Sequence, residues 1–166
     1  NDEELFLLTN DSDGDFIEDT ALSRTSIIER IASFKPKTVT MFIDACYSGE
    51  TRDANDDELL IASARPVRKL EDESNLPDNF NMFSASQISQ ASSSTKKETG
   101  VKNGIFSYYL MKGLEGSADL NKDRKITNGE LFEYLSKNVP KIARTLHNRD
   151  QDPFFKGDNN LILTRF

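Results

Sequence analysis

Short apolar runs separated by polar stretches mark the elements of the first part of the chain. Glu4–Thr9 (ELFLLT) and Thr38–Ile43 (TVTMFI) have the length and the apolar content of buried strands. Between them the spacing of apolar residues predicts a helix that Ser23 caps and Pro36 ends. Its apolar stripe consists of Ile27, Ile28, Ile31 and Phe34. Strand, helix and strand in this order predict a βαβ unit with parallel strands.

The rest of the chain predicts a third strand, two helices and a last strand. Asn79–Ala85 (NFNMFSA) and Leu161–Thr164 (LILT) have the pattern of strands. Two helices lie between them, and Thr127 opens the second. Their core faces are Phe106, Tyr109, Leu110 and Leu114 for the first helix, and Leu131, Phe132, Leu135 and Val139 for the second. The pattern predicts an α/β domain with helices on the faces of a small sheet.

Two polar stretches predict long loops. Residues 50–78 are charged and contain two prolines, with Leu59–Ile61 as their apolar island. This composition indicates a long excursion on the surface. The segment Ser89–Lys97 is rich in Ser and Lys, as mobile loops are. Because 166 residues suit one domain better than two, we expect a single domain over residues 1–166.

Composition and charge exclude several classes of partner. A hydrophobic content of 36% with 30% charged residues is typical of a soluble globular protein, and no apolar run is long enough to span a membrane. The net charge of −7 argues against nucleic-acid binding and favours basic substrates or metal ions. A single cysteine, no signal sequence and no initiator Met at Asn1 lead us to expect a cytoplasmic protein that is a fragment or a processed product.

The sole cysteine lies where a parallel sheet places its chemistry. Active groups gather beyond the carboxyl ends of such strands, and the strand ending at Ile43 runs into residues 44–49 (DACYSG). A thiol at Cys46 becomes a nucleophile if its pKa is lowered or a base stands nearby. Placement alone leaves a buried structural cysteine equally open.

The residues DACYSG, which follow an apolar strand, resemble the active-site motif of metacaspases and bacterial caspase-like peptidases. The resemblance continues through LLTNDSD at 7–13, MFSAS at 82–86 and NGIFSYYLMKGLEGSADLNKD at 103–123. It implies a caspase/hemoglobinase-like α/β fold with a mostly parallel sheet flanked by helices. It also implies a Cys-His dyad in which Cys46 attacks the peptide bond and forms a thioester. No organic cofactor is expected.

The histidine of the dyad is absent from the matching place in this chain. In caspases it lies about 50 residues before the cysteine, which here falls before Asn1. We therefore expect it, with the backbone N–H that its motif lends to the oxyanion hole, on an upstream segment or another chain. The only histidine, His147, lies in the polar stretch HNRDQD and is predicted to be a solvated loop residue.

The resemblance also suggests residues that bind substrate. Asp44 stands where metacaspase-like enzymes place an acid that receives the Arg or Lys before the cleaved bond, through charge-assisted hydrogen bonds. Caspases that cut after Asp have a different motif at this place, with no acid before the cysteine. Ser84 and Ser86 resemble residues of the substrate-lining strand. The alternatives are an Asp44 that caps the following turn, and serines that are merely structural.

An EF-hand-like pattern lies in the second half of the chain. In such a loop, oxygen atoms at positions 1, 3, 5, 7 and 12 surround Ca²⁺. The matching residues are Asp119, Asn121, Asp123, the carbonyl of Lys125, and Glu130. Arg124 replaces the expected glycine and strains the turn, and Thr127 with Glu130 also has the spacing of a helix capping box. A calcium ion and a metal-free cap both remain open.

A second acidic stretch contains Asp11, Asp13, Asp15, Glu18 and Asp19. It is either a divalent-ion site or an exposed acidic turn. The resemblance implies calcium activation through Glu18, Asp19 and Asp53, with the ion ordering the loop after Gly49. That loop also holds candidate self-processing sites at basic residues, namely Arg52, Arg65, Arg68 and Lys69.

These observations favour a cysteine endopeptidase that cleaves protein or peptide substrates after Arg or Lys. A non-catalytic caspase-like module that binds partners is the first alternative, since this chain lacks the expected histidine. A calcium-binding module with an incidental cysteine is the second. No nucleic acid and no membrane is expected as a partner.

Overall fold

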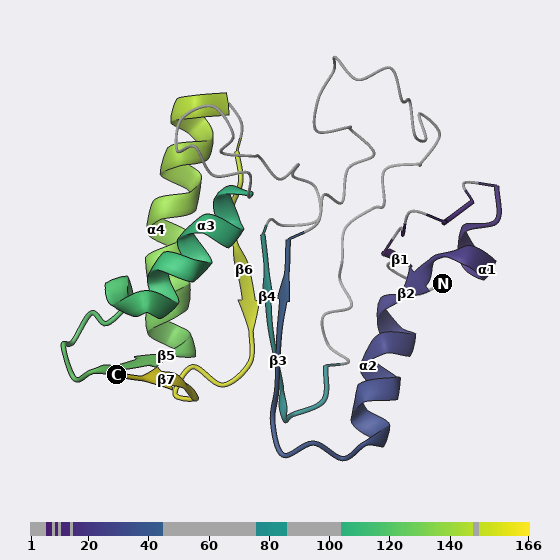
Figure 1. Cartoon of the computed structure of the whole chain (residues 1–166), viewed down its shortest axis with the longest axis horizontal. Helices are drawn as coiled ribbons and strands as arrows, with labels where there is room; N and C mark the ends of the chain where they lie inside the picture. Colours follow the sequence, from purple (N-terminus) through teal and green to yellow (C-terminus); the bar gives the residue numbers. More distant parts are fainter. Residues whose placement is uncertain are drawn as a thin grey trace.

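Helices and short strands alternate in the computed structural model, which describes residues 6–7, 9, 11–13, 15–44, 76–85, 104–147 and 150–166. The elements shown in Figure 1 are β1 (Phe6–Leu7), α1 (Ile17–Thr20), β2 (Leu22–Ser23), α2 (Arg24–Ser33), β3 (Val39–Ile43), β4 (Phe80–Ser84), α3 (Ile105–Lys112) with its π-helical extension η2 (Gly113–Ser117), β5 (Lys125–Thr127), α4 (Asn128–His147), β6 (Phe154–Lys156) and β7 (Ile162–Arg165). Most of the predicted loop at 50–78 and all of Ser89–Lys97 lie outside the described residues. The single-domain organisation stays a prediction.

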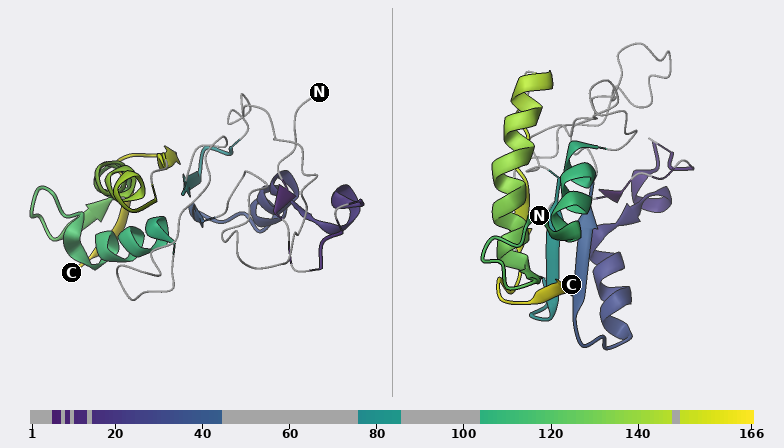
Figure 2. Two further views of the ribbon diagram at one scale, coloured as in Figure 1. Left: turned by 90° about the horizontal axis from the view of Figure 1, so that it is seen from above. Right: turned by 60° about the vertical axis from the view of Figure 1, so that its left-hand side comes forward.

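A three-stranded sheet in the order β3-β4-β6 forms the centre of the fold. β3 and β4 are parallel, with Val39 opposite Phe80 and Ile43 opposite Ser84, so their carboxyl ends coincide. β6 runs antiparallel to β4. Figures 1 and 2 show α3 and α4 on one side of this sheet and α2 on the other. The expected α/β class with flanking helices is confirmed, but the sheet is mixed, whereas a mostly parallel sheet was expected: only β3 and β4 pair in parallel among the described strands.

The predicted pairing of the first strand is wrong. β1 is only two residues long and pairs antiparallel with β2, a strand that the sequence pattern did not predict. The polar segment between them folds back through hydrogen bonds such as Asp13 N to Thr20 Oγ1 at 2.8 Å. This local return places β1 beside the residues that precede α2, and the parallel neighbour of β3 is β4 instead.

Helix α2 confirms its predicted cap but not its whole apolar stripe. Ser23 is the N-cap, and its Oγ accepts the N–H of Ser26 at 3.1 Å. Ile28 is the one buried residue of this helix, whereas Phe34 lies just past its end and is 78% exposed. No helix within the described ranges combines the length and the apolar character needed to cross a bilayer.

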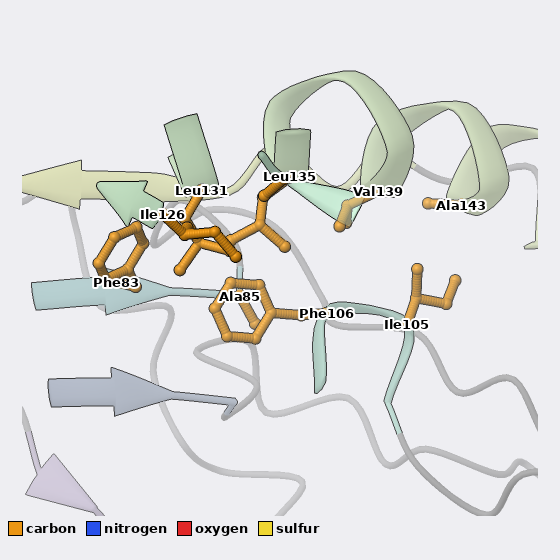
Figure 3. Packing of buried hydrophobic residues seen from close by; sticks show 10 residues of the cluster. Phe83, Ala85, Ile105, Phe106, Ile126, Leu131, Leu135, Val139 and Ala143 are labelled. Atoms are coloured by element: carbon orange, nitrogen blue, oxygen red, sulfur yellow. The ribbon is translucent and has the colours of Figure 1, made fainter. Parts of the chain in front are cut away.

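The hydrophobic core lies between β4 and the helices α3 and α4. Figure 3 shows its side chains, which are Phe83, Ala85, Ile105, Phe106, Ala118, Ile126, Leu131, Leu135, Val139 and Ala143. The members from α4 follow one another every four residues, as an amphipathic helix requires. Phe83 stacks on Phe42 of β3 and packs against Phe155 of β6, so one aromatic row crosses the sheet. Both predicted helix faces therefore point into this core.

A buried asparagine pair ties α4 to the sheet. Asn128 Nδ2 donates to Asn81 Oδ1 at 3.0 Å and to the carbonyl of Asp158 at 2.8 Å. Gly157 packs so closely on Asn81 that a Cβ there would overlap it. These contacts fix the turn after β6, a strand that the sequence pattern missed.

The last predicted strand is present but belongs to a separate sheet. Leu161–Thr164 was expected, and β7 covers Ile162–Arg165. It pairs antiparallel with β5, which was not predicted, just before α4. The core residue Ile126 lies in β5, so this small sheet closes the core from below α3 and α4.

Candidate active site

The carboxyl ends of β3 and β4 form the place where the sequence predicts catalysis. Ile43 and Ser84 are register partners there, and the Ala85 N–H donates to the carbonyl of Ile43 at 2.8 Å. Asp44 follows directly and is half-buried. Cys46 and Ser86 lie outside the described residues, so their predicted roles as nucleophile and substrate contact stay predictions.

Asp44 contacts the start of α3, which is 63 positions away in sequence. The Oγ of Ser107 donates to Asp44 Oδ2 at 2.6 Å. Ser107 lies in the first turn of α3. The Asp44 carboxylate therefore contacts the first turn of α3.

Gly104, the N-cap of α3, lies against the same carboxylate. Its φ of −61° and ψ of 155° are angles that any residue adopts. A Cβ at this position would nevertheless overlap Asp44 Oδ2 and lie 3.1 Å from Oδ1. The glycine is thus needed for space and not for backbone freedom.

Ser84 is buried at the end of β4, with 4% of its surface exposed. It alternates with Phe83, which faces the core, so its side chain points to the opposite face of the sheet. The next carbonyl, that of Ala85, accepts Nε2 of the fully buried Gln151 at 3.0 Å. Gln151 is a site-supporting residue that the sequence pattern did not suggest.

Two half-buried tyrosines and an exposed lysine lie next to one another on α3. Tyr108 and Tyr109 meet edge to face, and Lys112 Nζ lies 4.9 Å from the ring centre of Tyr108. Burial, followed by the neighbouring tyrosines, raises the pKa of Tyr109. Lys112 has a raised pKa because of its interaction with Tyr108.

The loop 119–125 has part of the geometry of a calcium loop. Asp119 accepts the N–H groups of Asp123 and Arg124, at 3.1 Å each, and Asp123 Oδ1 accepts the N–H of Lys125 at 3.0 Å. Arg124, at the position where the motif has glycine, is left-handed with φ of 64°. The backbone therefore makes the sharp turn despite the substitution.

Glu130, the twelfth position of this motif, belongs to a capping box. Its Oε2 accepts the N–H of Thr127 at 3.0 Å and the Oγ1 of Thr127 at 2.9 Å, and its own N–H donates back to that Oγ1 at 3.2 Å. Its Oε1 is buried and has no hydrogen-bond partner among the described residues. Nor does any group of three or more His, Cys, Asp or Glu side chains there have an arrangement that could hold a metal ion. The loop makes the sharp turn of the motif, but its acids do not form a group among the described residues that could hold a metal ion.

The second acidic stretch is an exposed turn in the described part of the chain. Glu18 and Asp19 are exposed on α1, and Asp53 lies outside the described residues. A hydrogen bond from Thr9 lowers the pKa of Asp11. The predicted calcium set of Glu18, Asp19 and Asp53 stays a prediction. The prediction that His147 lies in a loop is wrong, because α4 extends to this residue.

Sequence reasoning found Asp44 but missed Ser107 and Gly104, its neighbours in space. Both belong to the segment 103–123 whose resemblance was noted, and no feature of that segment singles them out. The family model described as caspase domain matches residues 8–159, which is most of the chain. No curated protein sequence matches the chain. With the sheet, the flanking helices and the acid beyond β3 in place, the family match shows that the chain belongs to the caspase-domain family of cysteine peptidases.

Proposed function

We propose that this protein is a cysteine endopeptidase that cleaves after Arg or Lys. The family match supports a peptidase that acts on protein substrates. The observation that carries the specificity is the Asp44 carboxylate, which stands half-buried beyond β3, two residues before Cys46. Asp44 receives the side chain before the cleaved bond, and Cys46 attacks the carbonyl that follows it.

The chemistry needs a base that this sequence does not supply at the expected place. A histidine from outside residues 1–166 takes the thiol proton of Cys46, and the thiolate sulfur bonds to the substrate carbonyl carbon. The C–N bond then breaks, and the histidine gives its proton to the leaving amine. Water hydrolyses the thioester, which releases the new carboxyl group and restores the thiol.

A carboxylate in this position favours a guanidinium over an ammonium group. Arg can donate two parallel hydrogen bonds to a carboxylate, whereas Lys interacts as a point charge. Because the guanidinium fork matches a carboxylate in this way, we expect Arg to be preferred to Lys.

The experiment is cleavage of matched fluorogenic peptides by the natural full-length protein. The peptides differ only in the residue before the cleaved bond, which is Arg, Lys, Ala or Asp. We expect turnover of the Arg and Lys peptides, and we expect Cys46→Ala to abolish it. Asp44→Asn should reduce turnover of the Arg and Lys peptides more than that of the Ala peptide. Cleavage after Asp would overturn the specificity. No turnover of any peptide would favour the alternative, a caspase-like module that binds partners.

Calcium regulation is part of the same proposal. Support comes from the left-handed Arg124 and from the N–H groups folded around Asp119, which are features of a calcium loop. Glu130 would have to supply its buried Oε1, since Oε2 is engaged by Thr127. When bound, calcium would supply charge that orders acidic loops. Turnover measured with calcium and with chelator, together with mass spectrometry for self-cleavage at Arg52, Arg65, Arg68 or Lys69, tests it.

A further inference from the structure

We propose that Gly104 and Ser107 together hold Asp44 in the one orientation that reads a basic side chain. These two residues are named the Asp44 seat below. The inference rests on the proposed function, because it assigns the residues that position the specificity-determining acid. Neither residue touches the substrate in this scheme, so both are positioning residues.

The backbone at Gly104 leaves no space for a side chain beside Asp44. Its backbone angles suit any amino acid, yet a methyl group there would overlap Asp44 Oδ2. The carboxylate thus rests directly on the backbone at the start of α3. One side of Asp44 is closed by this contact, which removes rotamers that would turn the carboxylate toward the helix axis.

Ser107 holds the same carboxylate through a hydrogen bond. At 2.6 Å, the separation between Ser107 Oγ and Asp44 Oδ2 is in the range of hydroxyl groups that donate to an ionised carboxylate. The first turn of α3 also presents the positive end of the helix dipole, which favours a negative charge there. Both features favour this placement of the carboxylate.

The start of α3, which carries the Asp44 seat, is held rigidly by the core. Ile105 and Phe106, which lie between Gly104 and Ser107, are fully buried in the core. Their packing fixes the first turn of α3, so the hydroxyl of Ser107 is held in place before any ligand arrives. A carboxylate whose orientation is fixed in advance loses less entropy when it binds a guanidinium.

The seat makes a prediction that differs from that of a structural contact. Loss of the Ser107 hydroxyl should weaken the binding of a basic side chain without changing the binding of a neutral side chain of the same shape. A hydroxyl that serves only to stabilise α3 would leave the ratio of the two unchanged. Threonine keeps the hydroxyl and should therefore restore the ratio.

The test measures peptide binding by calorimetry, in the natural full-length protein carrying Cys46→Ala so that no peptide is cleaved. Two peptides are compared. They differ only in the residue before the bond that would be cleaved, which is Arg in one and citrulline, the neutral isostere of Arg, in the other. We expect Ser107→Ala to weaken the Arg peptide about tenfold, roughly one charge-assisted hydrogen bond, and to leave the citrulline peptide unchanged. Ser107→Thr should bind as the parent does, and Gly104→Ala should lose at least as much Arg affinity as Ser107→Ala.

Ser33→Ala is the matched control, because the Ser33 hydroxyl donates only to the carbonyl of Arg30 in its own helix. Thermal melts of every variant report whether it folds. If Ser107→Ala does not fold, Ser107→Thr keeps the test decisive. An unchanged Arg-to-citrulline ratio in Ser107→Ala overturns the seat while leaving the proposed function intact. A parent protein that binds both peptides equally overturns the basic specificity, and the seat with it.

Discussion

The capping box at the start of α4 allows a prediction that separates a structural role of Glu130 from a metal-binding one. Thr127 donates two hydrogen bonds to Glu130 Oε2, from its N–H and from its Oγ1. Glu130→Ala removes the oxygen that accepts both hydrogen bonds, and Glu130→Gln retains an oxygen that can accept them, because glutamine also serves in capping boxes. The glutamine amide would take the place of Oε1, which has no hydrogen-bond partner among the described residues.

The magnitude follows from these contacts. A lost cap lowers the free energy of unfolding by about 1 kcal/mol, and a lost acid in the first turn of a helix by about 0.3–1 kcal/mol more. Glu130→Ala should therefore cost about 1.3–2 kcal/mol, or roughly 3–8 °C in melting temperature for a domain of this size. Glu130→Gln loses only the charge and should cost about 0.5 kcal/mol.

The assay is chemical and thermal unfolding in chelator, with Glu133→Ala as the control for charge. Glu133 is exposed on the same helix, and its removal should change stability by less than about 0.5 kcal/mol. Equal losses in the alanine and glutamine variants would refute the cap reasoning. With calcium at a hundred times its Kd, the wild type should gain about 2.7 kcal/mol and Glu130→Gln should not. No gain in the wild type would refute the calcium proposal.

Three further predictions concern the backbone and an alkaline titration. Gly157→Ala should cost about 2–4 kcal/mol in urea unfolding, because φ is 148° and a Cβ would overlap Asn81; a loss below about 1 kcal/mol would contradict this packing. Arg124→Gly should raise stability in chelator by up to about 1 kcal/mol, since φ is 64°, and a lower stability would show that its side chain contributes. Burial raises the pKa of Tyr109, so the folded state holds this proton more tightly and its contribution, complete below about pH 10, is lost as the pH rises further. Tyr109→Phe should flatten that alkaline fall in unfolding free energy, and an unchanged slope would refute it.

Features set by neighbours in sequence were predictable. The Ser23 cap, the Thr127 and Glu130 capping box and the core face of α4 each depend on residues three or four positions apart. Strand partners depend on distant segments, and there the pattern failed. β1 pairs with β2, and the three-residue β6 carries too few residues to show a period.

The candidate site shows the same limit. Asp44 was predicted because it lies two residues before Cys46, where the metacaspase-like motif that the chain resembles has an acid. Ser107 comes from a helix 63 residues later, and a serine in the first turn of a helix is common for local reasons alone. Only the tertiary contact reveals it, and the same holds for Gly104, whose backbone angles give no reason for a glycine.

The uneven distribution of buried side chains has a consequence for amide hydrogen exchange. Within the described part of the chain, the ten members of the core cluster come from residues 83–143, whereas Ile28 is the one buried residue of α2. Local opening of α2 exposes little apolar surface and so requires little free energy. Amides of α2 should exchange within its own opening reaction, and those of α4 and β4 only when the whole core unfolds. A native-state exchange experiment would then record two stability levels in one chain.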